Sequence, residues 1–262
     1  MKEYSVSYRP ICHLHTTERV FEEHLKNELN LYLKTNNIIH ENHHGGIAHR
    51  SRNTVKTLID WHMNKAYENN KISLLISTDL SMAFDVVDHS ILEEKMEYYG
   101  ITGSELKFFK TYLKDRTQYV EGDTHKSRVR TLPGCSVIQG SKLSSILYTI
   151  YTNEIPALHK IMKDEEVYRE LTGKEITVNN EVEHHTYNYV DDSNSCVIFN
   201  NANEIQEYVD NYFEILKEYH NLQKLKLNED KTMLMIACQP KHKAEAKAIE
   251  IKEEEYSIKP QS

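Results

Sequence analysis

The sequence has no apolar run that approaches the roughly 18 residues needed to span a membrane. Its amino terminus, residues 1–5, lacks the apolar core of a secretory signal peptide. None of the four cysteines has the Cys-x-x-Cys spacing typical of zinc sites, and we expect a reducing compartment. The chain also contains no internal repeat and no low-complexity stretch. These absences predict an intracellular protein, in the cytoplasm or the nucleus, without a membrane partner.

Charged residues make up 27% of the 262 residues and hydrophobic residues 39%, which predicts a packed core. The net charge of −8 argues mildly against nucleic-acid binding, which usually requires a basic surface. Basic residues nevertheless gather in residues 49–52, 107–116 and 126–130, so a basic groove on an acidic body stays open. The histidine pairs His43-His44 and His184-His185 are too close in sequence to ligate one metal together, and we expect them in surface loops.

Hydrophobic residues recur every three to four positions in several stretches, which predicts amphipathic helices. The predicted helices cover residues 17–36, 52–69, 88–100, 105–113 and 203–221, with a further one that ends near Tyr151. Short β-prone runs predict strands at 72–78, 117–120, 127–132, 186–190 and 196–199, and two strands between 225 and 236. This order predicts an α+β fold in which an antiparallel sheet is backed by helices on one side.

Carboxylates stand at the ends of two predicted strands. Asp191 and Asp192 lie in the turn of a predicted hairpin, and Asp79 follows the strand at 72–78. Adjacent buried carboxylates repel each other unless a cation accompanies them, and oxygen ligands favour Mg²⁺ or Mn²⁺. By itself an Asp-Asp pair is more typical of an ordinary turn. We call Asp79 the first carboxylate station and Asp191-Asp192 the second. The two stations are about 110 residues apart and can meet only if their strands are neighbours in the sheet.

Several longer motifs favour the interpretation of these carboxylates as a metal site over their interpretation as an ordinary turn. In chain order they are Tyr-Arg-Pro-Ile at 8–11, Asp-Leu-Ser-Met-Ala-Phe-Asp at 79–85, Gln-Gly-Ser at 139–141 with Tyr-Thr-Asn-Glu-Ile-Pro at 151–156, Tyr-Val-Asp-Asp at 189–192, and Leu-Asn-Glu-Asp-Lys-Thr at 227–232. Over most of its length the chain therefore resembles the reverse transcriptase domain of non-LTR (LINE-like) retroelements. Each motif is moderate evidence, but their shared order and workable gaps make the resemblance strong.

The resemblance implies a right-hand polymerase fold made of fingers and palm. Residues 1–72 would form part of the fingers and residues 73–240 the palm, with a polar insertion near 157–186. Residues 241–262 read as a charged tail, and we expect the thumb to be largely missing. The implied activity is RNA-directed DNA synthesis with two Mg²⁺ ions, Mn²⁺ being an alternative. The implied partners are an RNA template, a DNA primer and dNTPs, together with a separate chain or domain that supplies a thumb or an endonuclease.

The same resemblance assigns the metal ligands. Asp79 and Asp191 would bridge two ions about 4 Å apart, the separation usual in two-metal sites. Asp192 would support the metal or the primer end less directly. The backbone carbonyl of Leu80 would supply a further oxygen.

Substrate contacts follow from the resemblance as well. Phe84 would be the steric gate that excludes a 2′-hydroxyl, although an ordinary core phenylalanine is the alternative. Gln139 and Gly140 would border the nascent base pair, where the missing side chain of glycine allows close approach. Lys231 would protonate or bind pyrophosphate, although a plain surface lysine is the alternative.

Arginines are the candidates for holding the triphosphate. Arg9, Arg50 and Arg52 can each bind phosphate oxygens through a planar guanidinium. The sequence departs from the family here, because Gly45-Gly46 is not followed closely by an arginine. Ile138 also replaces a common proline, and residues 144–145 replace a common Gly-Pro. These changes bear on substrate affinity and fidelity more than on metal binding.

Two other functions stay open. The expected loss of the thumb, the altered fingers and the acidic net charge are compatible with a catalytically weak or inactive nucleic-acid-binding remnant. An RNA-directed RNA polymerase shares the palm geometry, but Phe84 at the gate position argues against it.

Overall fold

The computed structural model describes residues 11–122, 125–132, 134–177 and 179–242. The chain forms two compact units, each built from two separate stretches of sequence. The first unit comprises Met1–Ile39 and Met82–Tyr151, and the second comprises His40–Ser81 and Thr152–Ser262. Within the described residues, no helix is long and apolar enough to cross a membrane.

The second unit is built on an antiparallel four-stranded sheet with the order β4-β5-β1-β6. The strands are β1 (Ile72–Thr78), β4 (Glu183–Tyr189), β5 (Asp192–Phe199) and β6 (Met233–Ala237). Strands β4 and β5 form the predicted hairpin, and β1 pairs with β5 along its whole length. The strand predicted at 72–78 is confirmed, and its buried residues explain why it reads as a continuous apolar run.

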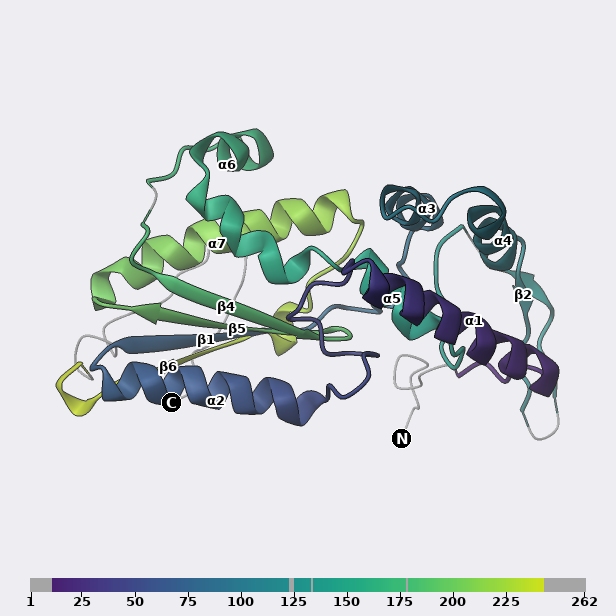
Figure 1. Cartoon of the computed structure of the whole chain (residues 1–262), viewed down its shortest axis with the longest axis horizontal. Coiled ribbons are helices and arrows are strands. Elements are labelled where there is room, and N and C mark those ends of the chain that lie inside the picture. Colours follow the sequence, from purple (N-terminus) through teal and green to yellow (C-terminus); the bar gives the residue numbers. More distant parts are fainter. Residues whose placement is uncertain (1–10, 123–124, 133, 178, 243–262) are drawn as a thin grey trace. The chain divides into compact units, whose positions relative to one another are not determined.

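Helices cover both faces of this sheet, as Figure 1 shows. Helix α2 (Arg52–Glu68) packs on one face through Val55 and Ile59, which cluster with Tyr187 and Leu75. Helix α7 (Ile205–Leu222) covers the opposite face, where Tyr212 meets Ser195 of β5. The prediction of helices on one side was wrong. Strands with apolar residues on both faces must be covered on both, and residues 72–76 contain such a run.

Residues 157–186, predicted to form a polar insertion, contain regular structure next to α7. A 3₁₀ segment, η2 (Ile155–Lys163), leads into helix α6 (Glu165–Thr172). Met162 and Tyr168 are buried, and the Tyr168 hydroxyl donates to Asn211 of α7 at 3.1 Å. Helix α7 was predicted at 203–221, and its aromatic residues Tyr212 and Tyr219 are buried.

The first unit is mainly helical. It contains α1 (Thr16–Thr35), α3 (His89–Tyr98), α4 (Gly103–Leu113) and α5 (Ser144–Tyr151), with a two-stranded ribbon of β2 (Thr117–Gln118) and β3 (Arg130–Thr131). All of these elements were predicted, although the ribbon is shorter than expected. Helix α3 begins as its sequence suggests, because the Asp88 carboxylate caps the amides of Ser90 and Ile91.

Two further local predictions were wrong. Only one of the two strands expected between residues 225 and 236 exists, because a short 3₁₀ turn, η4 (Glu229–Lys231), interrupts the pattern. Leu227 makes only an isolated bridge to Leu80. The histidine pairs do not lie in exposed loops, since His43, His44 and His184 are buried. One ring nitrogen of each is hydrogen-bonded, in His43 to Thr152, in His44 to Thr54 and in His184 to Tyr208, which offsets part of the cost of burial.

Candidate active site

Strand pairing brings the two carboxylate stations to the same end of the sheet. Thr78, the last residue of β1, pairs with Ser193 near the start of β5. Asp79 directly follows this pair and Asp192 directly precedes it. Asp79 and Asp192 are 113 positions apart in sequence (192 − 79) and thus lie at the ends of neighbouring antiparallel strands, which was the condition for them to meet.

Asp79 is held by the turn that precedes β6. The backbone amide of Asn228 donates to the Asp79 carbonyl at 2.8 Å, and the Asn228 side chain donates to Oδ2 of Asp79 at 3.1 Å. Lys231 Nζ lies 3.0 Å from the same carboxylate oxygen. Sequence motifs at 79 and 228–231 are therefore joined directly. The carboxylate is largely enclosed, with 16% of its side chain exposed, whereas Lys231 is 57% exposed.

The turn that carries Asp191 is tight and strained. Tyr189 pairs with Asp192, so Val190 and Asp191 form a two-residue hairpin loop. Val190 has a φ of +59°, a conformation that a β-branched residue rarely adopts. Strained backbone of this kind persists only where the surroundings enforce it, and it occurs often at functional sites.

Gly45 packs directly against this turn. A Cβ at Gly45 would lie 2.4 Å from the Val190 nitrogen, so only glycine fits without movement. The preceding residues reinforce the contact, since the His44 amide donates to the Asn188 carbonyl at 2.8 Å. Residues 44–46, which we call the glycine loop, thus support the Asp191-Asp192 turn from outside the sheet.

Asp192 faces Arg52 at the start of α2. Arg52 Nη2 lies 3.0 Å from Asp192 Oδ2, and the guanidinium lies 5.2 Å from the centroid of the Tyr189 ring. Burial raises the pKa of Asp192 above its ordinary value, and the charges of Asp191 and Asp79 raise it further while Arg52 opposes the shift. Asp192 therefore lies within electrostatic reach of both Asp191 and Asp79.

The residues fit a divalent cation by donor type and by charge. Carboxylate oxygens are the ligands that Mg²⁺ and Mn²⁺ prefer, and a cation would relieve the repulsion felt by Asp192. In this structure two of the carboxylates are paired with basic side chains instead. Asp79 is paired with Lys231, and Asp192 is paired with Arg52. In the described part of the chain, no three His, Cys, Asp or Glu side chains are grouped so as to hold a metal ion.

Phe84, Gln139 and Gly140 belong to the first unit. The Phe84 ring stacks on Tyr148 with centroids 5.0 Å apart, and its carbonyl accepts from the Val137 amide at 2.8 Å. Val137, which is hydrogen-bonded to Phe84, therefore lies two residues before Gln139 at the start of the loop that contains Gln139 and Gly140. Asp79 and Phe84 are five residues apart in sequence, but they fall in different units.

The remaining predicted arginines differ in their surroundings. Arg50 donates to the carbonyls of Glu41 and His43, so its guanidinium braces the loop before Gly45. Arg52 is 70% exposed beside Asp192 and is the better placed of the two to meet an anion. Arg9 lies outside the described residues.

The described part of the second unit contains hollows. One of about 380 Å³ lies between α2 and the sheet and is lined by Arg52, Tyr189 and Asp192, with Met63 and Met235 further along. A larger one of about 450 Å³ lies between η2 and α7 and contains none of the predicted site residues. The smaller hollow is the relevant one, because Asp192 and Arg52 line it.

Comparisons with known proteins identify the family of the chain. The model of the reverse transcriptase (RNA-dependent DNA polymerase) family matches residues 1–256, and the chain belongs to this family. Enzymes of the family act on nucleic acids and generally use a divalent metal ion. The resemblance seen in the sequence is thereby confirmed.

One curated relative is the probable RNA-directed DNA polymerase from transposon BS of Drosophila melanogaster. It is 28% identical over 163 residues, which cover 59% of this chain and 17% of the relative. Two solved structures share the fold. Truncated apo telomerase from Candida tropicalis has a TM-score of 0.56 and 14% identity, covering 84% of this chain and 41% of that one. Candida albicans telomerase with a TWJ fragment of telomeric RNA has a TM-score of 0.55 and 14% identity, covering 85% and 35%. The chain thus spans less than half of each relative.

Sequence reasoning missed three residues that shape the site. Asn228 was quoted only as a member of the motif at 227–232, without a role of its own, although it binds Asp79. Gly45 was discussed only for the arginine that does not follow it. Asn188 is buried and accepts from the Ser193 hydroxyl at 3.0 Å, which fixes the base of the hairpin. A polar residue inside a buried strand is the one signal that pointed to Asn188.

Proposed function

We propose that the chain is an RNA-directed DNA polymerase that joins dNTPs to a primer 3′-hydroxyl on an RNA template. One observation carries the proposal. Strand β1 pairs with β5 so that Asp79 and Asp191-Asp192 stand at one end of the sheet. Family membership supports the reaction class, and the position of the carboxylates supports the mechanism.

Asp79, Asp191 and Asp192 would hold two Mg²⁺ ions, with Mn²⁺ as an alternative and the Leu80 carbonyl as a further ligand. Bound ions of this kind activate the attacking hydroxyl and neutralise the leaving pyrophosphate. Asn228 orients the Asp79 carboxylate through its hydrogen bond to Oδ2. Lys231, bonded to the same oxygen, supplies a positive charge and a proton donor beside it.

The other substrate roles follow the family pattern. Phe84 would exclude the 2′-hydroxyl, and Gln139 with Gly140 would border the nascent base pair. Arg52 would leave Asp192 to bind the triphosphate, with Arg9 and Arg50 as further candidates. In functional terms residues 1–72 would be part of the fingers and residues 73–240 the palm. A thumb or endonuclease would come from another domain or chain.

The test is primer extension with oligo(dT)-primed poly(A), dTTP and Mg²⁺. The protein should extend the primer, and Asp191→Asn should reduce extension to background because the metal loses a charged ligand. Asp210→Asn, on the exposed side of α7, is the matched control and should retain activity. Failure of the wild type, alone and fused to a thumb domain, would reject the proposal. Preferential use of rNTPs would assign it to RNA synthesis instead.

A second candidate is an inactive nucleic-acid-binding remnant. It is favoured by the pairing of Asp79 with Lys231 and of Asp192 with Arg52, which neutralises both carboxylates without a metal. This candidate predicts primer–template binding that weakens linearly in log affinity with log salt, and no Mg²⁺-dependent synthesis. Absence of binding at low salt would exclude it.

A further inference from the structure

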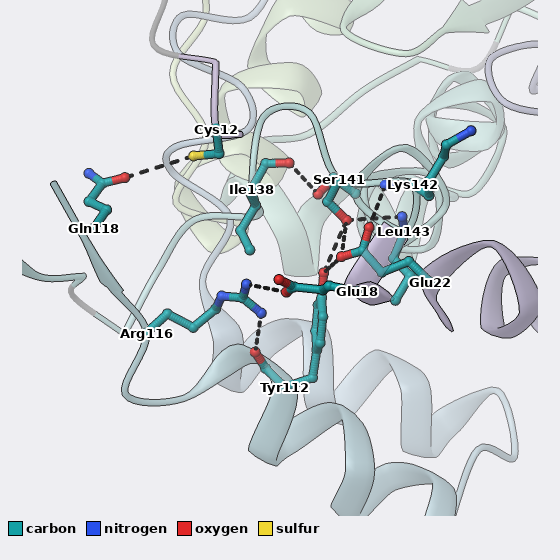
Figure 2. A network of polar contacts seen from close by, with 11 residues as sticks. Cys12, Glu18, Glu22, Tyr112, Arg116, Gln118, Ile138, Ser141, Lys142 and Leu143 are labelled. Carbon is teal, nitrogen blue, oxygen red and sulfur yellow. Dashed lines mark hydrogen bonds and ion pairs between the residues drawn. The ribbon is translucent and has the colours of Figure 1, made fainter. Parts of the chain in front are cut away.

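A buried glutamate lies beside the loop that carries Gln139 and Gly140. Glu22 of α1 has 0% of its surface exposed. Figure 2 shows its carboxylate directed at the segment 141–143 and at Tyr112 of α4. A buried carboxylate is costly unless its oxygens are fully hydrogen-bonded, so the partners of Glu22 matter.

Two of those partners belong to the loop. Oε1 accepts from the Ser141 hydroxyl at 2.9 Å and Oε2 from the Lys142 backbone amide at 2.9 Å. The Tyr112 hydroxyl donates to Oε1 at 2.5 Å. Burial and this bond raise the pKa of Tyr112, so the hydroxyl stays protonated as a donor. The carboxylate therefore joins three elements of the first unit at one point.

The opposite side of the loop is also held. The Cys12 amide donates to the Gln139 carbonyl at 2.8 Å. Gly140 has a φ of +105°, and a Cβ there would lie 2.8 Å from the Cys12 carbonyl oxygen. Gln139 and Gly140 thus sit between a contact with Cys12 on one side and the bonds of Glu22 on the other. Such bonding fixes a loop within the few tenths of an ångström that a catalytic site requires.

We propose that Glu22 is a positioning residue that fixes the Gln139–Gly140 loop through Ser141 and Lys142. Neither the sequence motifs nor the assigned site residues include it. The proposal rests on the proposed function only for its kinetic consequence, because the loop is assigned there to the nascent base pair. Its structural consequence, an ordered loop, is independent of any activity.

The chain provides a matched control at the next position. Glu23 pairs with the Lys142 ammonium at 2.9 Å, but both side chains are over 40% exposed. Glu22→Gln puts an amide N–H opposite the donors of the loop, whereas Glu23→Gln only weakens a surface ion pair. The two variants make the same chemical change. Glu22→Gln alters the buried bonds to Ser141, Lys142 and Tyr112, whereas Glu23→Gln alters only the exposed pair with the Lys142 side chain.

Hydrogen exchange followed by mass spectrometry is the first measurement. Amides 138–143 should exchange at least about tenfold faster in Glu22→Gln than in Glu23→Gln, because one charged anchor of the loop is lost. Amides of α3 should be unchanged in both. Ser141→Ala keeps the buried carboxylate and should give the same local increase in exchange. It replaces Glu22→Gln as the test variant if Glu22→Gln does not fold. Equal exchange of amides 138–143 in wild type, Ser141→Ala and the two glutamate variants would overturn the proposal.

Steady-state primer extension is the second measurement. Glu22→Gln should raise KM for dTTP about tenfold while kcat changes less, since a misplaced loop binds the incoming base pair poorly. Glu23→Gln should leave both unchanged. A Glu22→Gln variant with normal KM despite a mobile loop would contradict the kinetic role. If the wild type itself shows no extension, the proposed function fails, and the exchange result still decides whether Glu22 positions the loop.

Discussion

Asn228 binds Asp79 twice, through its backbone amide to the carbonyl and through its side chain to the carboxylate. The residues are 149 positions apart in sequence, yet the bonds make the turn before β6 a direct support of the first carboxylate station. Side chains that orient a metal ligand in this way commonly matter almost as much as the ligand itself.

Replacement of Asn228 by alanine should therefore impair catalysis more than folding. The variant keeps the backbone bond and loses the side-chain bond to Asp79. Primer extension should fall by roughly 10- to 100-fold, and the free energy of unfolding by about 1 kcal/mol. Asn200→Ala, which removes an exposed bond to Glu181 far from the site, should lose neither. Full activity in Asn228→Ala would show that Asp79 needs no such support.

Gly45 gives a prediction about the hairpin turn. In Gly45→Ala the new methyl group would clash with the backbone of Val190, so either the glycine loop or the turn must move. We expect a loss of about 1–3 kcal/mol in the free energy of unfolding together with weaker activity. Gly134→Ala is the control, because a Cβ there meets nothing within 4 Å. Equal stability of the two variants in urea denaturation would refute this packing.

The buried histidines predict acid sensitivity of the second unit. Burial lowers the pKa of His43 to about 4, and it lowers the pKa of His159 and of His220 to about 4 as well. Their unfolded pKa is near 6.5, so the unfolded chain binds more protons below that pH. Stability is then fully present above pH 6.5 and is lost as the pH falls toward about 4.

Urea denaturation at pH 7 and pH 5 measures this effect. The wild type should be less stable at pH 5 by roughly 5 kcal/mol, since each of the three groups contributes nearly 2 kcal/mol. His220→Leu, which removes one of the buried groups, should flatten the profile, whereas His24→Gln on the exposed side of α1 should not. A wild-type profile that is flat between these pH values would contradict the depressed histidine pKa values.

The sequence predicted most elements because their signals are local. Asp79 stands at the end of a recognisable strand, and Asp191 and Asp192 stand in a recognisable turn. The predictions that failed concern residues whose burial depends on contacts with residues distant in the sequence. Phe21 belongs to the apolar stripe of α1 but is 51% exposed, whereas Glu22 beside it is buried. The partners that make its burial possible are 90 and 119 residues away, and no local pattern contains them.

The histidines illustrate the same limit. His184 lies in a strand, and its burial depends on Tyr208 of α7 and on the stacked ring of His159. The strand interrupted at 229–231 has a similar cause, since the turn there serves Asp79. Local periodicity cannot show that a turn is required by a residue in another strand.

Binding of Mn²⁺, followed by electron paramagnetic resonance of the free ion, tests the central claim most directly. Asp79 and Asp191 should act together, so Asp79→Asn and Asp191→Asn should each weaken binding by at least about tenfold. Asp210→Asn should bind as the wild type does. Wild-type affinity in both site variants, or no saturable binding by the wild type, would contradict the account.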